Sequence, residues 1–234
     1  MKKIMFSDRY GLTQAVLEGK KTMTRRNAGA LNHPLVTDIS ECGIDDKGKA
    51  HIMITYSTGV KETVYPIYQP GEEVAIGQKY IDLKDEDAFY EALQKADPSF
   101  PLECIKDEKG CYNKMFVKAE WMPHRIRITD VSYERIQDIS DVDCRKEGII
   151  HVNWRQYLKQ DVYDFTPQKY KEHSLWTLPI FEESFLDSWA EKKPGEYAAE
   201  SAKVAFAVLI FKLMGRKVWE QNPFVFAYEF ELLR

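Results

Sequence analysis

The sequence predicts an α+β fold: a β-rich core that carries helical insertions. Residues 125–133 alternate between apolar and polar side chains, and residues 224–232 form an almost continuous apolar strand with alternating glutamates. Between these stretches, residues 151–221 change to a helical and aromatic pattern. The 234 residues contain neither an internal repeat nor a Ser/Gly linker, so we expect one domain.

The N-terminal segment predicts a strand, a short helix and a second strand. Residues 2–6 have the composition of a short strand, and residues 12–17 place apolar side chains on one helical face. Asp8 is expected to cap this helix and Gly19 to end it, because helices often stop at a left-handed glycine. Residues 22–26 are β-prone and short.

Residues 27–66 are predicted to be the first of three insertions. The sequence DDKG at 45–48 is typical of a turn and precedes the alternating residues 51–56, so a hairpin is expected. The chain then makes a tight turn at 69–72 and continues as a strand over 73–80.

A second insertion is predicted at about 82–113. It contains an acidic helix over 82–94 and a turn at 106–110. Residues 115–119 alternate in the manner of a strand, which would place them in the same core as residues 125–133.

The third insertion is predicted at about 151–221. A short helix at 141–146 precedes it, with Ser140 as its cap and Gly148 at its end. The last helix of the insertion is expected to run over 198–214 and to stop at a glycine.

Charge limits the class of ligand. Lysine and arginine number 33 and aspartate and glutamate 37, so the formal net charge is −4. A protein that coats nucleic acid with its whole surface is usually basic. Any nucleic-acid contact is therefore expected to be a local patch, which favours a small and selective site.

The cysteines and apolar runs limit cofactors and location. The four cysteines form no C-x-x-C pair and the histidines do not fall at zinc-ligand spacings, so we expect neither a metal nor another cofactor. The first residues lack the apolar part of a signal peptide, which predicts a cytoplasmic protein with free thiols. The longest apolar run, residues 204–211, is too short to span a bilayer, so we expect no membrane association.

Four segments, taken in order, resemble the ASCH family, whose fold is similar to that of PUA domains. The most specific is residues 16–26, VLEGKKTMTRR, which resembles the family signature ILxGxKTxTxR. The others are residues 68–72, pieces of 125–149, and pieces of 219–231. The resemblance is to the longer members, of the phage and Bacteroides type. It implies a PUA-like β-barrel core with flanking helices and helical insertions.

The chain departs from the family pattern after the turn at 69–72. Many members carry there a WVRE-like strand with a charged Arg–Glu pair. The matching positions are Gly77 and Gln78, between Ile76 and Lys79. If the family's pair holds a ligand, this part of the site has changed, and Gln78 is its remaining candidate.

The densest basic cluster of this acidic protein lies within residues 20–26. Its candidate ligand-binding residues are Lys20, Thr22, Arg25 and Arg26, beside Lys21 and Thr24. Planar guanidinium groups suit phosphates and base edges, and lysine supplies a mobile point charge. The cluster predicts a basic cleft that binds RNA or a modified nucleobase. The alternative is a solvated charged strand at the exit of a helix.

The family resemblance also implies an alternative function. Some small ASCH proteins resemble an amidohydrolase that removes acyl groups from N4 of cytidine with a threonine, a lysine and a glutamate. Carried over to this chain, these residues are Thr24, Lys21 and Glu147. Glu147 is chosen because it follows a helix start matched by Asp138 and Ser140.

Such chemistry sets two conditions. A threonine hydroxyl is a poor nucleophile until a base takes its proton, and a lysine is that base only when desolvation or nearby cations lower its pKa. Lys21 and Thr24 have opposite parity in an ideal strand, so they converge only if Lys21 belongs to the turn after Gly19. Otherwise Thr24 is an ordinary strand residue and Glu147 a surface residue of a last helical turn.

His124 and the aromatic residues of the third insertion complete the candidates. His124 follows a proline at a strand entrance, where it either rims the cleft or packs as an ordinary histidine. The aromatic side chains of 151–221 either stack on bases or pack in a core. The same insertion would bind a protein partner if the protein is a phage-derived interaction scaffold, the third function considered.

Overall fold

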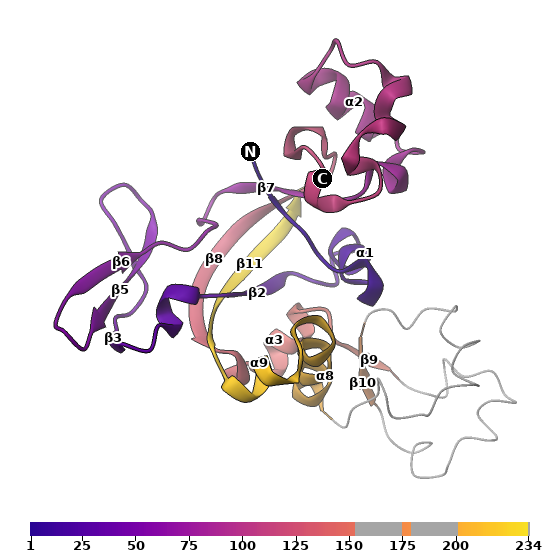
Figure 1. The fold of residues 1–234 in the computed structure, drawn as a ribbon. Helices are drawn as coiled ribbons and strands as arrows, with labels where there is room; N and C mark the ends of the chain where they lie inside the picture. Colours follow the sequence, from indigo (N-terminus) through magenta and orange to yellow (C-terminus); the bar gives the residue numbers. More distant parts are fainter. Residues whose placement is uncertain (153–174, 179–200, 234) are drawn as a thin grey trace, which may run out of the picture.

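The structure, a computed structural model, describes residues 1–152, 175–178 and 201–233, and within them it is a mixed α+β protein (Figure 1). The α+β prediction is therefore confirmed at this level. The strands are β1 (Lys2–Ile4), β2 (Met23–Asn27), β3 (Val36–Ile39), β4 (Gly43–Ile44), β5 (Ala50–Tyr56), β6 (Lys61–Val64), β7 (Glu73–Ile76), β8 (Arg125–Arg135), β9 (Ile150–Val152), β10 (Leu175–Thr177) and β11 (Phe224–Leu233). The helices are α1 (Leu12–Leu17), α2 (Asp87–Ala96), α3 (Asp141–Lys146), α8 (Ala202–Met214) and α9 (Arg216–Gln221).

The central sheet has five strands in the order β1-β7-β8-β11-β2. β1 pairs with β7 in parallel, and the other neighbours are antiparallel. β8 and β11 pair along nearly their whole length, with a register shift between Glu229 and Phe230. The patterns at 125–133 and 224–232 thus predict the two longest strands correctly.

The main hydrophobic core lies between this sheet and the helices α1, α3 and α8. It joins Ile126 and Tyr228 of the sheet to Val16, Cys144 and Phe206 of the three helices, and all five are almost completely buried. β2 lies beside this core, because it pairs with β11 and contacts α3. The core therefore fixes the position of residues 21–27.

The first insertion forms a separate small sheet. β3 and β4 pair with one edge of β5, and β6 pairs with its other edge. The Asp45 carboxylate accepts backbone hydrogen bonds from Lys47 and Lys49, at 2.9 and 2.8 Å, which stabilises the turn between β4 and β5. The predicted hairpin is confirmed.

The second insertion has its own core. Tyr80 stacks against Phe89 of α2 and packs on Trp121, and all three rings are buried. Burial of Tyr80 here explains why β7 ends at Ile76 rather than at residue 80. The connecting 3₁₀ helices are Tyr80–Leu83, Leu102–Asp107, Lys109–Cys111, Lys114–Phe116 and Ala119–Trp121.

The strand predicted at 115–119 is wrong. These residues lie in two 3₁₀ turns, because the Asn113 side chain accepts a hydrogen bond from the backbone of Met115, at 2.9 Å, and starts a turn there. The backbone N–H of Lys118 donates to the Tyr80 hydroxyl at 2.8 Å rather than to a neighbouring strand. Local side-chain hydrogen bonds thus replace sheet pairing.

We expect the substitution Gly110→Ala to destabilise the protein by about 1–3 kcal/mol, as overpacked core substitutions do. A Cβ at Gly110 would lie 2.5 Å from Cε2 and 2.8 Å from Cζ of the Tyr80 ring, which is fully buried and unable to retreat. Urea denaturation measures the change. Gly29→Ala is the matched control, since its Cβ would meet nothing within 4 Å. Equal urea midpoints of unfolding for Gly110→Ala and Gly29→Ala would contradict the prediction.

At the N-terminus, Gly11 rather than Asp8 precedes α1 as its cap, with φ of 65°. The Asp8 carboxylate instead accepts hydrogen bonds from Thr13 Oγ1 at 2.6 Å and from Lys114 Nζ at 2.5 Å, so it joins α1 to the second insertion. Gly19 ends α1 with φ of 72°, as predicted. Ser140 caps α3 by accepting a hydrogen bond from Asp143 N at 3.1 Å, also as predicted.

The third insertion is described only in part. Residues 150–152 and 175–178 provide the antiparallel pair β9 and β10, and α8 ends at Gly215 as the sequence predicts. The predicted aromatic platforms other than Trp176 lie outside the described residues, and so does most of the predicted protein-binding segment. None of the helices in the described part of the chain has the length and apolar character needed to span a bilayer.

Candidate functional site

A cavity of about 380 Å³ lies between the segment after β1, the strand β2 and the helix α8. Its polar wall contains all three residues implied by the amidohydrolase resemblance, Lys21, Thr24 and Glu147, together with Arg25 and Arg26. The apolar wall is formed by Met5, Phe6, Leu12, Phe206, Leu209, Ile210, Leu213 and Met214. The structure therefore brings five of the nine sequence-predicted site residues to one concavity.

Lys21 reaches this cavity because it belongs to a turn and not to β2. After Gly19 the backbone N–H of Lys21 donates to Ala15 O at 2.9 Å, so the residue is still attached to the end of α1. β2 begins two residues later, at Met23. The opposite parity of Lys21 and Thr24 is thus no obstacle, and both side chains line the same cavity.

The Lys21 ammonium is buried and fully hydrogen-bonded. Its Nζ donates to Glu147 Oε2 at 2.5 Å, to the Glu147 carbonyl at 2.9 Å and to the Met23 carbonyl at 2.7 Å. Only 2% of the residue is exposed. Burial lowers the pKa of Lys21 below its usual value, Glu147 opposes this shift, and Arg26 and Arg25 add to it.

Glu147 is held by cations on both of its oxygens. It follows α3, where its backbone N–H still donates to Asp143 O, and Arg25 Nη1 donates to Glu147 Oε1 at 3.1 Å. Arg25 also contacts Glu134 Oε1 at 2.6 Å and Asp143 Oδ2 at 3.4 Å. Burial lowers the pKa of Arg25, but Glu147 and Glu134 more than offset it, so the pKa is raised. Arg25 therefore stays charged and positions Glu147.

The Thr24 hydroxyl has no partner among the described residues. Thr24 is 5% exposed, lies in β2 opposite Tyr228 and lines the cavity. None of the side-chain hydrogen bonds formed by residues 1–152, 175–178 and 201–233 involves its Oγ1. A hydroxyl that lines a cavity without a hydrogen bond to these residues is available to a ligand.

Arg26 differs from its neighbours because no carboxylate in the described part of the chain pairs with it. Its Nη2 donates to the Met5 carbonyl at 2.7 Å. Its Nε is buried and has no hydrogen-bond partner. Its guanidinium lies 5.8 Å from the centre of the Phe6 ring, and the Lys21 ammonium lies at the same distance from that ring.

The other four predicted site residues lie outside the cavity. Lys20 is largely exposed and pairs with Glu18 at 2.6 Å, whereas Thr22 lies beside α3 with its backbone N–H bonded to Lys146 O at 2.8 Å. Gln78 Oε1 and His124 Nδ1 contact one another at 2.8 Å. The last pair joins the central sheet to the second insertion, so the predicted ligand set narrows to the residues that β2 and its preceding turn present.

Sequence reasoning missed the apolar wall, of which α8 supplies five residues. A signal was present, because α8 is apolar on nearly all of its faces: Val204, Leu213 and Met214 are exposed although the helix also buries Phe206 and Leu209. A helix of this kind has more apolar surface than one core contact requires.

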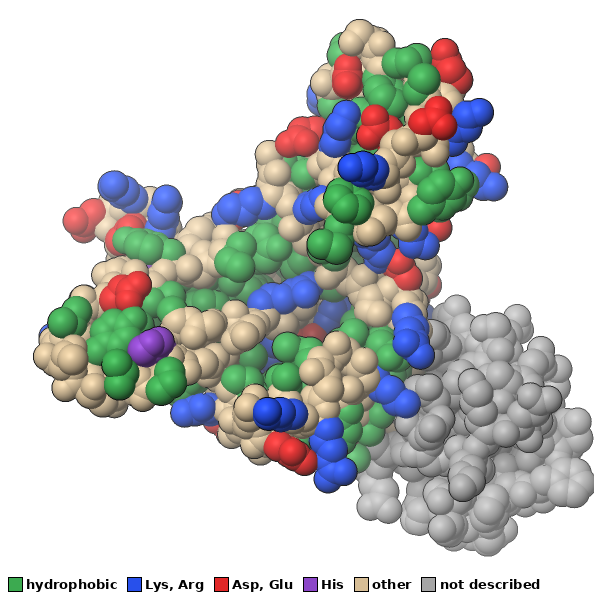
Figure 2. Space-filling view, in the orientation of Figure 1, with side chains coloured by type: hydrophobic (Ala, Val, Ile, Leu, Met, Phe, Trp, Pro, Cys, Tyr) green, Lys and Arg blue, Asp and Glu red, His purple; other side chains and the backbone are tan. Residues whose placement is uncertain are grey.

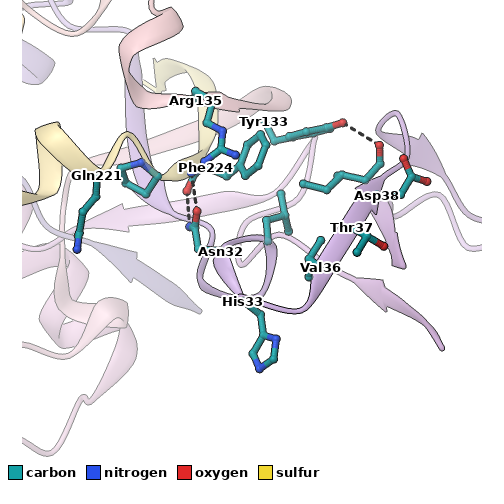
Figure 3. Close-up of a pocket in the computed structure, with 12 residues that line it drawn as sticks. Asn32, His33, Val36, Thr37, Asp38, Tyr133, Arg135, Gln221 and Phe224 are labelled. Carbon is teal, nitrogen blue, oxygen red and sulfur yellow. Dashed lines mark hydrogen bonds between the residues drawn. The ribbon is translucent and has the colours of Figure 1, made fainter. Parts of the chain in front are cut away.

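A larger cleft of about 710 Å³ lies between β3, the end of β8 and the start of β11 (Figure 3). Several of its polar groups already have partners. Asn32 exchanges two hydrogen bonds with the backbone of Phe224, at 2.8 and 2.7 Å, and Tyr133 donates to Ser40 O at 2.9 Å. Arg135 stacks over the Phe224 ring at 3.7 Å. These contacts join the first insertion to the central sheet.

The described residues show no broad basic surface on the face drawn in Figure 2. Figure 2 shows lysine and arginine side chains mixed with aspartate and glutamate over the visible face. Within the described ranges no group of three histidine, cysteine, aspartate or glutamate residues is arranged to hold a metal ion. The smaller cavity is therefore the site whose geometry supports chemistry.

No protein-family model, no curated protein and no solved structure matches this chain. The residues that line the cavity, and the resemblance of the short segment 16–26, are therefore the features that point to a function.

Proposed function

We propose that the protein is a PUA-like β-barrel protein of the ASCH type and that it hydrolyses the N-acyl bond of an acylated cytidine-type nucleoside in the cytoplasm. Two features support the barrel. The outer strands of the central sheet, β1 and β2, approach one another where Arg26 donates to Met5 O. The ILxGxKTxTxR-like segment supplies most of the polar wall of the cavity. The lysine, second threonine and arginine positions of this family signature are thus positions that line a site in this chain.

The observation that carries the enzymatic proposal is that Thr24, Lys21 and Glu147 line one buried cavity. Its volume of about 380 Å³ suits a nucleoside-sized ligand and not a long polynucleotide. Of its three cations, Lys21 and Arg25 are already neutralised by carboxylates, which disfavours a purely electrostatic RNA cleft. A nucleophile, a buried amine and a carboxylate are the groups that amide hydrolysis requires.

The chemistry begins from the Lys21–Glu147 ion pair. Within this pair burial lowers the pKa of Lys21 and so favours its neutral amine, although Glu147 opposes the shift. The amine takes the proton of the Thr24 hydroxyl while Oγ1 attacks the acyl carbon. The Lys21 ammonium formed in this step then protonates the leaving N4 nitrogen as the C–N bond breaks, while Glu147 holds Lys21 in position. Water cleaves the acyl-threonine ester, which releases a carboxylic acid and restores the Thr24 hydroxyl.

Binding without turnover is the second candidate. Arg26 favours it, since this cation lines the cavity without a carboxylate partner among the described residues. The ligand would then be one modified nucleobase or one flipped-out nucleotide of an RNA, because the cavity accommodates no more. The interaction-scaffold alternative involves residues 151–221, of which most lie outside the described ranges.

Incubation with N4-acetylcytidine, followed by ultraviolet absorbance, tests the proposal. We expect release of acetate and cytidine at a rate that rises with pH and levels off below pH 10.5, because Lys21 must lose a proton and its pKa is lowered by burial. If the protein binds the compound in calorimetry but does not hydrolyse it at any pH, the enzymatic proposal is wrong and the binding function replaces it.

A further inference from the structure

Arg26 is the only cation of the cavity that lacks a carboxylate partner among the described residues. Lys21 and Arg25 each contact Glu147, at 2.5 and 3.1 Å, and Arg25 has two further carboxylates. Within the described ranges Arg26 donates to one carbonyl only, although a guanidinium has five N–H donors. A partly buried positive charge without a counter-charge is unfavourable beside an apolar wall.

The orientation of Arg26 places its charge away from the reacting bond. Thr24 and Arg26 lie two residues apart in β2, and therefore on the same face, at a backbone separation of roughly 6.6 Å. The Arg26 guanidinium is turned toward the chain after β1, where it contacts Met5 O and lies over Phe6. A ligand whose acyl carbon meets Thr24 would extend its far end toward Arg26.

We infer that Arg26 binds an anionic oxygen group at the far end of the ligand, so that the preferred substrate is negatively charged. This inference rests on the proposed function. Two sources supply such a group: a phosphate on the sugar, as in a nucleoside 5′-monophosphate, or a carboxylate at the end of the acyl chain. Both suit the planar donors of arginine.

Three substrates separate the possibilities: N4-acetylcytidine, its 5′-monophosphate, and N4-succinylcytidine. For the wild-type protein we expect kcat/KM to be at least about tenfold higher for one of the two anionic compounds than for the neutral one, mainly through KM. In Arg26→Gln the ratio of anionic to neutral kcat/KM falls toward one. If the 5′-monophosphate is the preferred substrate, the group that Arg26 binds is a phosphate. If N4-succinylcytidine is preferred, that group is the carboxylate of the acyl chain.

An equal loss of kcat for all three substrates in Arg26→Gln would overturn the inference, because that pattern belongs to a group that stabilises the transition state. Arg26→Lys keeps the charge and is expected to retain part of the preference. It also serves if Arg26→Gln does not fold, which thermal unfolding reveals. If a folded Arg26→Lys variant loses the whole preference for the anionic substrate, the preference depends on the planar hydrogen-bonding geometry of the guanidinium and not on its charge alone.

Calorimetry separates this inference from the proposed function. If the wild-type protein hydrolyses none of the compounds, the enzymatic proposal fails while anion binding is still measurable. Either the 5′-monophosphate of N4-acetylcytidine or N4-succinylcytidine is then expected to bind at least about tenfold more tightly than N4-acetylcytidine, with a difference that 0.5 M salt reduces. Equal affinities for all three compounds in the wild type would reject the role of Arg26.

Discussion

Glu147→Gln is expected to lower the free energy of unfolding by about 3–5 kcal/mol, the usual cost of removing one partner of a buried ion pair. Glutamine has the same shape, but its amide nitrogen donates hydrogen bonds and must face either Lys21 or Arg25. Arg25 keeps Glu134 and Asp143, whereas Lys21 has no other carboxylate contact among the described residues. The lysine would remain a buried charge bonded to two carbonyls.

Urea denaturation measures this loss, and Glu229→Gln is its matched control. Glu229 and Lys146 form a lysine–glutamate pair of the same length, 2.5 Å, but both side chains are more than one-third exposed. Exposed pairs contribute at most about 1 kcal/mol, so the control is expected to change little. The double variant Lys21→Met/Glu147→Leu should recover part of the lost stability, because neither charge is then buried alone. Similar losses for Glu147→Gln and Glu229→Gln would contradict the assignment of a buried pair.

Thr24→Ala is expected to reduce kcat for the acylated nucleoside by about 1,000-fold or more, since the proposed reaction has no other nucleophile. Its effect on stability should be only about 1 kcal/mol, because the hydroxyl makes no hydrogen bond with the described residues and only one methyl group is removed. Steady-state kinetics and urea denaturation of the same preparation separate the two effects.

Two variants control for Thr24→Ala. Thr24→Ser keeps the hydroxyl and should retain measurable turnover with the same pH dependence. Thr22→Ala removes a threonine two residues away, on the same segment, whose side chain does not line the cavity. Turnover that persists in Thr24→Ala at the wild-type rate would show that water attacks the substrate directly and that Thr24 is not the nucleophile.

The elements that could be predicted are those in which neighbouring residues specify the structure. β8 and β11 follow from apolar alternation, and the cap at Ser140 and the stop at Gly19 follow from single side chains at helix ends. Residues 115–119 alternate equally well, yet they form 3₁₀ turns. Their backbone N–H groups donate hydrogen bonds to side chains instead of to a neighbouring strand: Met115 to Asn113, and Lys118 to the hydroxyl of Tyr80. Tyr80 lies 38 positions from Lys118 in the sequence.

The site was predicted to a similar degree and for similar reasons. Lys21, Thr24 and Glu147 were expected to converge if Lys21 belonged to the turn, and the bond from its N–H to Ala15 O places it there. Gln78 and His124 were expected to join them, but they pair with each other elsewhere. No local pattern distinguishes these two outcomes, because each depends on which distant segment packs against the residue.

Arg25 and Arg26 show most clearly what each level of description determines. By itself, the amino-acid sequence determined that two guanidinium groups, two amines and two threonines follow one glycine turn in an acidic chain. Only the tertiary structure decided that Arg25 is neutralised by carboxylates from β8 and from α3 and its C-terminal end, while Arg26, which lines the same cavity, has no carboxylate partner among the described residues. The physical reason is that adjacent strand residues point in opposite directions, so identical side chains meet different surroundings.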